Sequence, residues 1–310
     1  MATPATDILT EILTAQGRRT LDGQEAVRRI LAAVRKQIIG EIAAAPAESF
    51  TGYRQQQMLT SIERLLFEAE AGMRVELGRG LNDSFEAGRT MLPQMAAVGS
   101  DITLTTFGVS SGILEQIKEF SWGRINAITN DAQAKIRAEI TLGLLGQQSP
   151  QQVASAIAGT LERPGVFKGI SERAEVITKT EMGRAFSMAA QKSFEDATDT
   201  LPGLQKMWLH AGHPKSPRIS HLGLSGSVKP VGEPFLAGTV IMRYPRDPKA
   251  PVSEIINCGC MHVPYMAEWG TKGEFLKSWT DAQEAANKPK GPHPDWIKAQ
   301  EAANKPKNKP

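Results

Sequence analysis

The chain has 310 residues, with 36 Lys and Arg against 33 Asp and Glu, a net charge of +3 and 41% hydrophobic residues. This length is typical of about two domains and is enough to bury a substantial core. The near balance of charge excludes polyelectrolyte behaviour of the whole chain. Two cysteines in so long a chain argue against a secreted disulfide framework and favour a reducing compartment.

The N-terminal residues are not typical of a signal peptide, and the sequence has no window typical of a membrane span. The first residues, MATPATDILTEILTAQG, contain no basic segment followed by an apolar run, so we expect no signal peptide. No window reaches the roughly 18 consecutive apolar residues of a membrane-spanning helix. We therefore expect no membrane segment.

The first 160 residues predict long amphipathic helices. Apolar residues recur at helical spacing over residues 24–45, 55–90 and 111–145. We expect the second of these helices to end before Pro93. Ser149-Pro150-Gln151-Gln152 has the pattern of a capping box and predicts the start of a further helix that ends near Pro164. One more helix is expected over residues 171–197.

Residues 201–268 have a different composition, dense in Pro and Gly, and helical periods vanish there. Short runs at 207–209, 239–242 and 255–263 predict strands of a loop-rich β region resting on the preceding helix. The predicted fold class is α+β. It has a long-helix N-terminal region (1–160), a small helix-plus-β-sheet module (161–268) and a flexible polar tail (269–310).

The tail contains an internal repeat. The nonapeptide AQEAANKPK occurs at residues 282–290 and again at 299–307. Each copy is polar and carries Lys and Pro, which is typical of a mobile segment. The alternative is a short peptide in two copies that docks on a partner.

The two cysteines, Cys258 and Cys260, lie one residue apart in EIINCGCMHVPY. Zinc sites usually use Cys-x2–4-Cys, but residues two apart on a strand share a face, and His262 follows on that face. His210, His213 and His221 are further possible ligands, so a zinc site is chemically possible. Two small buried thiols are the alternative. A redox pair or a Cys–His nucleophile has less support from the spacing.

Two polar segments are also candidates for function. Residues 206–249 hold seven Lys and Arg against Glu233 and Asp247, which predicts either a solvated loop face or a phosphate-binding face. Glu181 and Arg184 are i,i+3 neighbours beside Thr180. They form either a surface ion pair or a buried clasp in which Arg173 or Arg184 ties the helix to the β region. The sequence contains no GxxxxGK[ST], GxSxG or HExxH, which excludes the best-marked enzyme classes.

Five segments in order, ITKTEMGRAF, KMWLHAGHPKSPRISHLGLSG, EPF, RYPRDPKAP and EIINCGC, give the chain a family resemblance. Over roughly residues 150–265 it resembles the phage head morphogenesis family, the Mu protein F-like minor head proteins. HAGHPKSP departs from the family, which often has an acidic residue there, and so does Gly259, where Arg often stands. The matching positions are Thr180, Glu181, Arg184, Trp208, Arg218, His221, Leu224, Gly226, Phe235, Tyr244, Pro245, Asp247, Pro248, Ile256, Asn257, Cys258 and Cys260.

The resemblance implies a minor capsid protein that is made in the host cytoplasm, acts in head assembly and resides in the virion at the portal vertex. Its expected partners are the portal protein, other capsid proteins and packaged DNA, contacted without sequence preference, with no membrane involved during assembly. No catalysis is expected.

The resemblance also implies structural roles for the matching residues. Thr180, Glu181 and Arg184 would link the helix to the β region, and Trp208 and Phe235 would anchor its core. Asp247 belongs to the same module-defining set, and Asn257 would hold a turn. His221, Cys258 and Cys260 would close the module by packing or by binding zinc.

Two hypotheses of other classes stay open. The first is a transferase-like or nuclease-like enzyme that uses Glu181, His221 and the cysteines. The second is a DNA-binding protein with Lys215, Arg218, Arg243 and Arg246 on one exposed face, whose binding would depend strongly on salt.

Overall fold

The computed structural model describes residues 4–44, 52–104, 111–145, 149–160, 169–210 and 218–269. The predicted fold class is confirmed: long helices precede a small β module in an α+β chain. The long helices are α1 (Pro4–Ala43), α2 (Gly52–Gly99), α3 (Ser111–Leu144), α4 (Pro150–Thr160) and α5 (Ile170–Ala197). The AQEAANKPK repeat, His213 and Lys215 lie outside the described residues.

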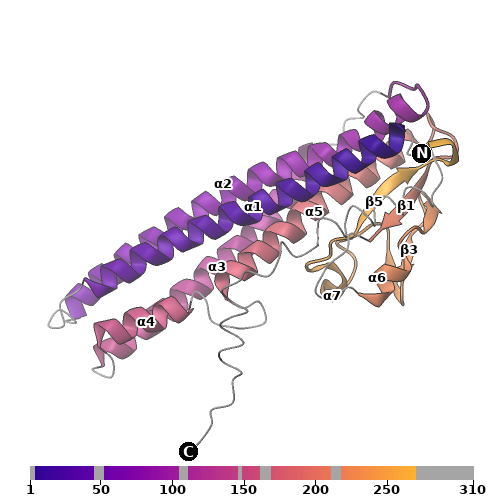
Figure 1. Cartoon of the computed structure of the whole chain (residues 1–310). Coiled ribbons are helices and arrows are strands. Elements are labelled where there is room, and N and C mark those ends of the chain that lie inside the picture. Colours follow the sequence, from indigo (N-terminus) through magenta and orange to yellow (C-terminus); the bar gives the residue numbers. More distant parts are fainter. Residues whose placement is uncertain are drawn as a thin grey trace, which may run out of the picture.

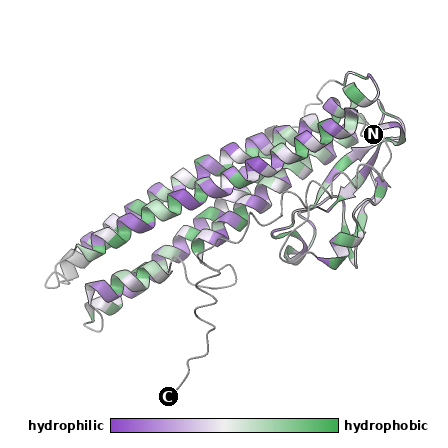
Figure 2. Ribbon diagram, in the orientation of Figure 1, coloured by the Kyte–Doolittle hydropathy of each residue, from purple (hydrophilic) through white to green (hydrophobic). Residues whose placement is uncertain are grey.

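The helices run alongside one another in an elongated bundle, and the β module lies at one end beside α5 (Figure 1). Each helix presents an apolar stripe to the bundle, so Met73, Leu77 and Leu81 of α2 are fully buried between their neighbours. Hydrophobic and hydrophilic residues alternate along the ribbons, as amphipathic helices require (Figure 2). Burial of these apolar stripes makes the largest favourable contribution to the free energy of folding of the bundle.

Two helix boundaries differ from the expected ones. Helix α1 begins at Pro4 rather than near residue 24, because Leu9 and Leu13 are buried in the core shared with the β module. Helix α2 continues through Pro93 to Gly99. The proline costs about 3 kcal/mol in a helix interior. Burial of Met91, Leu92, Met95 and Ala96 offsets that cost.

The β module is built on a three-stranded antiparallel sheet. The central strand β1 (Gln205–Leu209) pairs with β2 (Val228–Pro230) and with β5 (Met261–Tyr265). Strands β3 (Phe235–Ala237) and β4 (Val240–Met242) form a separate hairpin. Short helices α6 (Ile219–Gly223) and α7 (Val252–Ile255) and the 3₁₀ turn η2 (Ala267–Trp269) complete the module.

The prediction of a strand over residues 255–263 is correct only for residues 261–263, which belong to β5. Helix α7 occupies residues up to Ile255, and Ile256–Cys260 form a turn before β5 begins at Met261. Asn257 adopts a left-handed conformation with φ of 55°, which no strand residue does. The INCGC segment is therefore a turn and not the closing strand of the sheet.

Helix α5 belongs to both parts of the molecule. Ala185 and Ala189 pack into the bundle core, while Phe186 and Phe194 pack into a second core with Val263 of β5. Helix α2 approaches α5 so closely at Gly88 that any side chain there would collide with the backbone carbonyl of Phe186. The β module is thus positioned by a helix that is itself fixed within the bundle.

Within the described ranges, every helix is too short or too polar to cross a membrane.

Candidate functional site

Three of the predicted site residues meet in the interior of the β module. His221 comes from α6, and Cys258 and Cys260 come from the turn between α7 and β5. The Nδ1 atom of His221 lies 3.5 Å from Sγ of Cys258 and 3.6 Å from Sγ of Cys260. All three side chains are buried. We call this set the CCH cluster.

The local fold of the turn brings the two sulfurs together. The Cys258 amide donates to the Ile255 carbonyl, and the Asn257 amide donates to the Thr180 hydroxyl of α5 at 3.1 Å. The left-handed Asn257 reverses the chain between these two bonds. A turn, rather than one face of a strand, therefore aims both thiols at His221.

Arg246 also holds this turn, through its backbone carbonyls. Its Nη1 donates to the carbonyl of Cys258 at 2.9 Å and to that of Cys260 at 2.6 Å. The guanidinium lies against Gly183 of α5 and is 3% exposed. Arg246 was expected on an exposed DNA-binding face, and that expectation is wrong because the side chain is a buried structural group.

The imidazole of His221 is oriented by a carboxylate. Its Nε2 lies 2.8 Å from Oε2 of Glu254 on α7, and its ring packs edge-on against Trp208. Since a carboxylate accepts a hydrogen bond, Nε2 is the donor to Glu254, and Nδ1 is the ring atom that faces the sulfurs. Arg218 supports α7 by donating to the carbonyls of Ser253 and Ile256.

The two thiols have opposite electrostatic environments. A hydrogen bond from Cys260 holds the pKa of Cys258 well below its ordinary value, helped by His221 and Arg246 and opposed by burial. The same bond, with burial, raises the pKa of Cys260 well above its usual range. Burial also lowers the pKa of nearby His210. The pKa values of the two neighbouring thiols are therefore shifted in opposite directions.

The ion pairs expected to tie α5 to the β region connect α5 with α3 instead. Nη1 of Arg184 lies 2.6 Å from Oε2 of Glu181, and Arg124 of α3 lies 3.5 Å from Oε1. Burial raises the pKa of Glu181, while these arginines lower it. Arg173 pairs with Asp131, also on α3. Glu181 and Arg173 thus tie α5 to α3, and the hydrogen bond between Thr180 and Asn257 reaches the β module.

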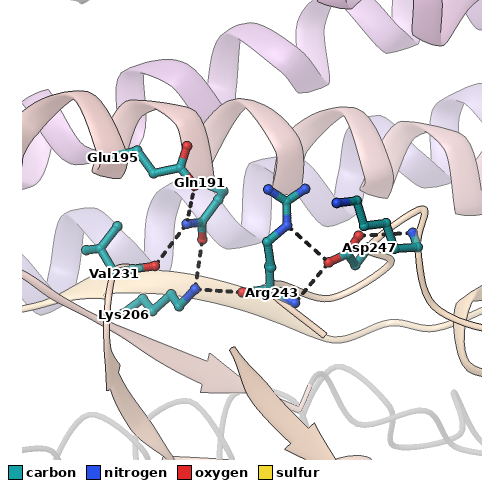
Figure 3. Close-up of polar contacts among 7 residues, drawn as sticks. Gln191, Glu195, Lys206, Val231, Arg243 and Asp247 are labelled. Atoms are coloured by element: carbon teal, nitrogen blue, oxygen red, sulfur yellow. Dashed lines mark hydrogen bonds and ion pairs between the residues drawn. The ribbon is translucent and has the colours of Figure 1, made fainter. Parts of the chain in front are cut away.

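A second polar network surrounds Lys206, which the sequence did not single out (Figure 3). This fully buried side chain of β1 donates to Oε1 of Gln191 at 3.2 Å and to the carbonyl of Arg243 at 2.7 Å. Asp247 accepts from the Arg243 amide at 2.9 Å, which closes the turn. Burial lowers the pKa of Lys206 to about 8. The ammonium group also lies 5.4 Å from the ring centroid of Phe235, which packs edge to face with Trp208.

The predicted basic face is not assembled by the described residues. Arg246 is buried, Arg218 is bonded to backbone carbonyls, and Lys215 lies outside the described part of the chain. Arg243 is half-exposed and lies 3.4 Å from Asp247. Several of the Lys and Arg residues in this segment therefore make hydrogen bonds inside the module and do not add to a basic surface.

A cavity of about 350 Å³ lies between α3, α5 and the segment that contains α7. Its lining is largely apolar, with Phe120 and Ile255 among the contributors, and Arg124 and Arg184 at its polar side. Glu181 and the CCH cluster do not line it. The groups of the enzyme hypothesis are therefore not gathered in this cavity.

The fold and site define a helical bundle that carries a small β module closed around a buried pair of cysteines and a histidine. No family model matches the chain, and no solved structure matches it. It is 35% identical over 96 residues to the uncharacterized protein YqbB of Bacillus subtilis (strain 168). That match spans 30% of this chain and 30% of the relative.

Proposed function

We propose that this protein is a minor capsid protein of a tailed bacteriophage, which acts in head assembly at the portal vertex and uses its β module as a structural unit. One observation carries the proposal. Residues of the head-morphogenesis motif that are up to 80 positions apart lie in one connected, buried set, from Thr180 of α5 to Cys260.

The burial of these residues supports a structural role over catalysis. Catalytic groups are expected to converge on an accessible cleft. Glu181 is 1% exposed and bound to Arg184, while His221 is bound to Glu254 and faces two buried sulfurs. This connectivity is suited to stabilising a small module whose own core is limited.

The helical bundle supports a role in assembly with other proteins. Leu21 on α1 and Phe67 and Val75 on α2 are largely exposed despite being apolar. These side chains are accessible on long amphipathic helices, the kind of element on which a partner's helices can pack. The proposed partners are the portal protein and other capsid proteins, in the host cytoplasm and then in the virion.

Purification of assembling heads through a tagged portal protein tests this proposal. We expect the chain to co-purify with the portal and to remain in finished heads at low copy number relative to the major capsid protein. A portal preparation that lacks the chain, with all of it free in the lysate, would overturn the proposal. An unrelated tagged cytoplasmic protein from the same lysate serves as the control for non-specific capture.

A further inference from the structure

We propose that the CCH cluster is a zinc site, with His221 Nδ1, Cys258 Sγ and Cys260 Sγ as ligands and Glu254 as the carboxylate that orients the histidine. The inference concerns a ligand of the β module and does not depend on a role in head assembly.

The distances from the histidine nitrogen to the two sulfurs match those found around a tetrahedral zinc ion. Zinc lies about 2.3 Å from thiolate sulfur and about 2.0–2.1 Å from imidazole nitrogen, which places sulfur and nitrogen about 3.5–3.6 Å apart at tetrahedral angles. The distances from Nδ1 of His221 to the two sulfurs are 3.5 and 3.6 Å. All three donor atoms lie within 4.8 Å of one another.

The two sulfurs lie at nearly the same distance from Nδ1 of His221, 3.5 and 3.6 Å. A neutral imidazole has one acceptor lone pair, so Nδ1 can accept fully from one thiol. The two nearly equal distances are those expected when both sulfurs and Nδ1 surround a common centre.

The chemistry of the donors selects zinc among the common divalent ions. Two thiolates and an imidazole suit zinc, whereas magnesium and calcium prefer oxygen ligands. Cysteine sulfurs are negatively charged when they bind a metal, and Arg246 places a buried positive charge on the turn that carries them. These three residues leave one position of the tetrahedron for a further donor.

The hydrogen bond between Glu254 and His221 is of the kind found behind a metal-bound histidine. Histidines that bind metals commonly donate their second N–H to a carboxylate, which fixes the ring and raises the basicity of the ligating nitrogen. The 2.8 Å contact from Nε2 of His221 to Oε2 of Glu254 has this arrangement. Arg218 approaches the same carboxylate at 3.9 Å and keeps it in place.

Metal analysis of the full chain, purified without chelators from zinc-supplemented cells, is the first test. We expect about one zinc ion per chain, and its loss from Cys258→Ser and Cys260→Ser variants. Folded protein with less than about a tenth of an equivalent would overturn the proposal. A disulfide between Cys258 and Cys260 in freshly purified, metal-free protein would overturn it as well.

Cobalt substitution identifies the ligands directly. We expect Co²⁺ to give a thiolate-to-cobalt charge-transfer band and the intense visible bands of tetrahedral coordination, both lost when Cys260 is replaced by Ser. Bound cobalt without a charge-transfer band would show that the sulfurs are not ligands and would reject this site.

The variant Glu254→Gln provides a measurement that does not require a ligand to be removed. Loss of a carboxylate behind a metal-bound histidine typically weakens metal binding by about 10–100-fold, which competition with a chromophoric chelator measures. The control is Glu233→Gln, because Glu233 is an exposed glutamate of the same module. Equal zinc affinities for the two variants would contradict the arrangement proposed here.

Discussion

The guanidinium group of Arg246 occupies the space beside Gly183 that a β-carbon would fill. A methyl group built at position 183 collides with Arg246 at Nη2, Cζ and Nε. From this position Arg246 donates to the carbonyls of Cys258 and Cys260. A single side chain therefore connects the bundle helix α5 with the turn that carries both cysteines.

Gly183→Ala is expected to destabilise the β module. The new methyl group would displace Arg246 and break its two hydrogen bonds, and a bond from a charged donor contributes about 1.5–3 kcal/mol. We expect the free energy of unfolding in urea to fall by about 3 kcal/mol, and zinc binding to weaken with it.

The matched control is Gly78→Ala in α2, because nothing lies within 4 Å of a β-carbon built at Gly78. Alanine has a higher helix propensity than glycine by about 1 kcal/mol, so this variant is expected to be unchanged or slightly more stable. Equal effects of the two substitutions on unfolding would show that the contact between Arg246 and Gly183 does not matter.

Local signals in the sequence predicted the parts of the fold that depend on neighbouring residues. The capping box at Ser149 forms as expected, with its hydroxyl accepting from the Gln152 amide and the Gln152 side chain accepting from the Ser149 amide. Helix α3 and helix α5 also lie within a residue of their expected bounds. Each of these features is encoded within one or two helical turns.

Features that depend on distant contacts could not be read in this way. The spacing of Cys258 and Cys260 left four histidines as candidates, and folding through α6 selects His221. Arg246 was predicted to lie on the surface because most arginines are exposed. It is buried because a glycine 63 positions earlier leaves room for its guanidinium group. The left-handed turn at Asn257 depends on its bond to Thr180, 77 positions away.

Gly88→Ala is expected to separate α2 from α5. A β-carbon at position 88 would collide with the carbonyl oxygen, carbonyl carbon and Cα of Phe186, all backbone atoms that cannot rotate away. Overpacking in a core costs about 1–3 kcal/mol when side chains can adjust, and we expect a cost at or above the top of that range here. Thermal unfolding followed by circular dichroism measures it, and a melting temperature equal to that of Gly78→Ala would contradict the close approach.

Lys206→Met is expected to lower stability despite replacing a charge with an apolar side chain. The substitution leaves Oε1 of Gln191 and the carbonyl of Arg243 without the donor that Lys206 supplies. A buried acceptor left unpaired costs about 1–3 kcal/mol. Lys192→Met on α5 is the control, since Lys192 is half-exposed and pairs with Asp196. Urea titrations of both variants at neutral pH should show a loss for Lys206→Met alone, and a loss shared equally by the two would refute the role of the network in Figure 3.

His262 is expected to make the fold sensitive to acid. The ring is fully buried between Phe194 and Tyr244, and neither nitrogen has a hydrogen-bond partner within the described part of the chain. Burial, reinforced by the charges of Lys206 and Arg246, holds its pKa well below 6.5. Below pH 6.5 the unfolded chain therefore binds a proton that the folded chain does not, and stability falls as the pH decreases.

The contribution of His262 is measured by comparing pH profiles with His262→Phe, which keeps an aromatic ring of similar shape and removes the titration. Linkage gives a slope of up to about 1.4 kcal/mol per pH unit below pH 6.5, so the wild type should lose about 2 kcal/mol more than the variant by pH 5. The difference between the profiles cancels the other titrating groups, including Glu181, whose raised pKa acts in the opposite direction. Profiles of equal slope for the wild type and the variant would contradict this prediction, because they would mean that the folded chain protonates His262 as readily as the unfolded chain does.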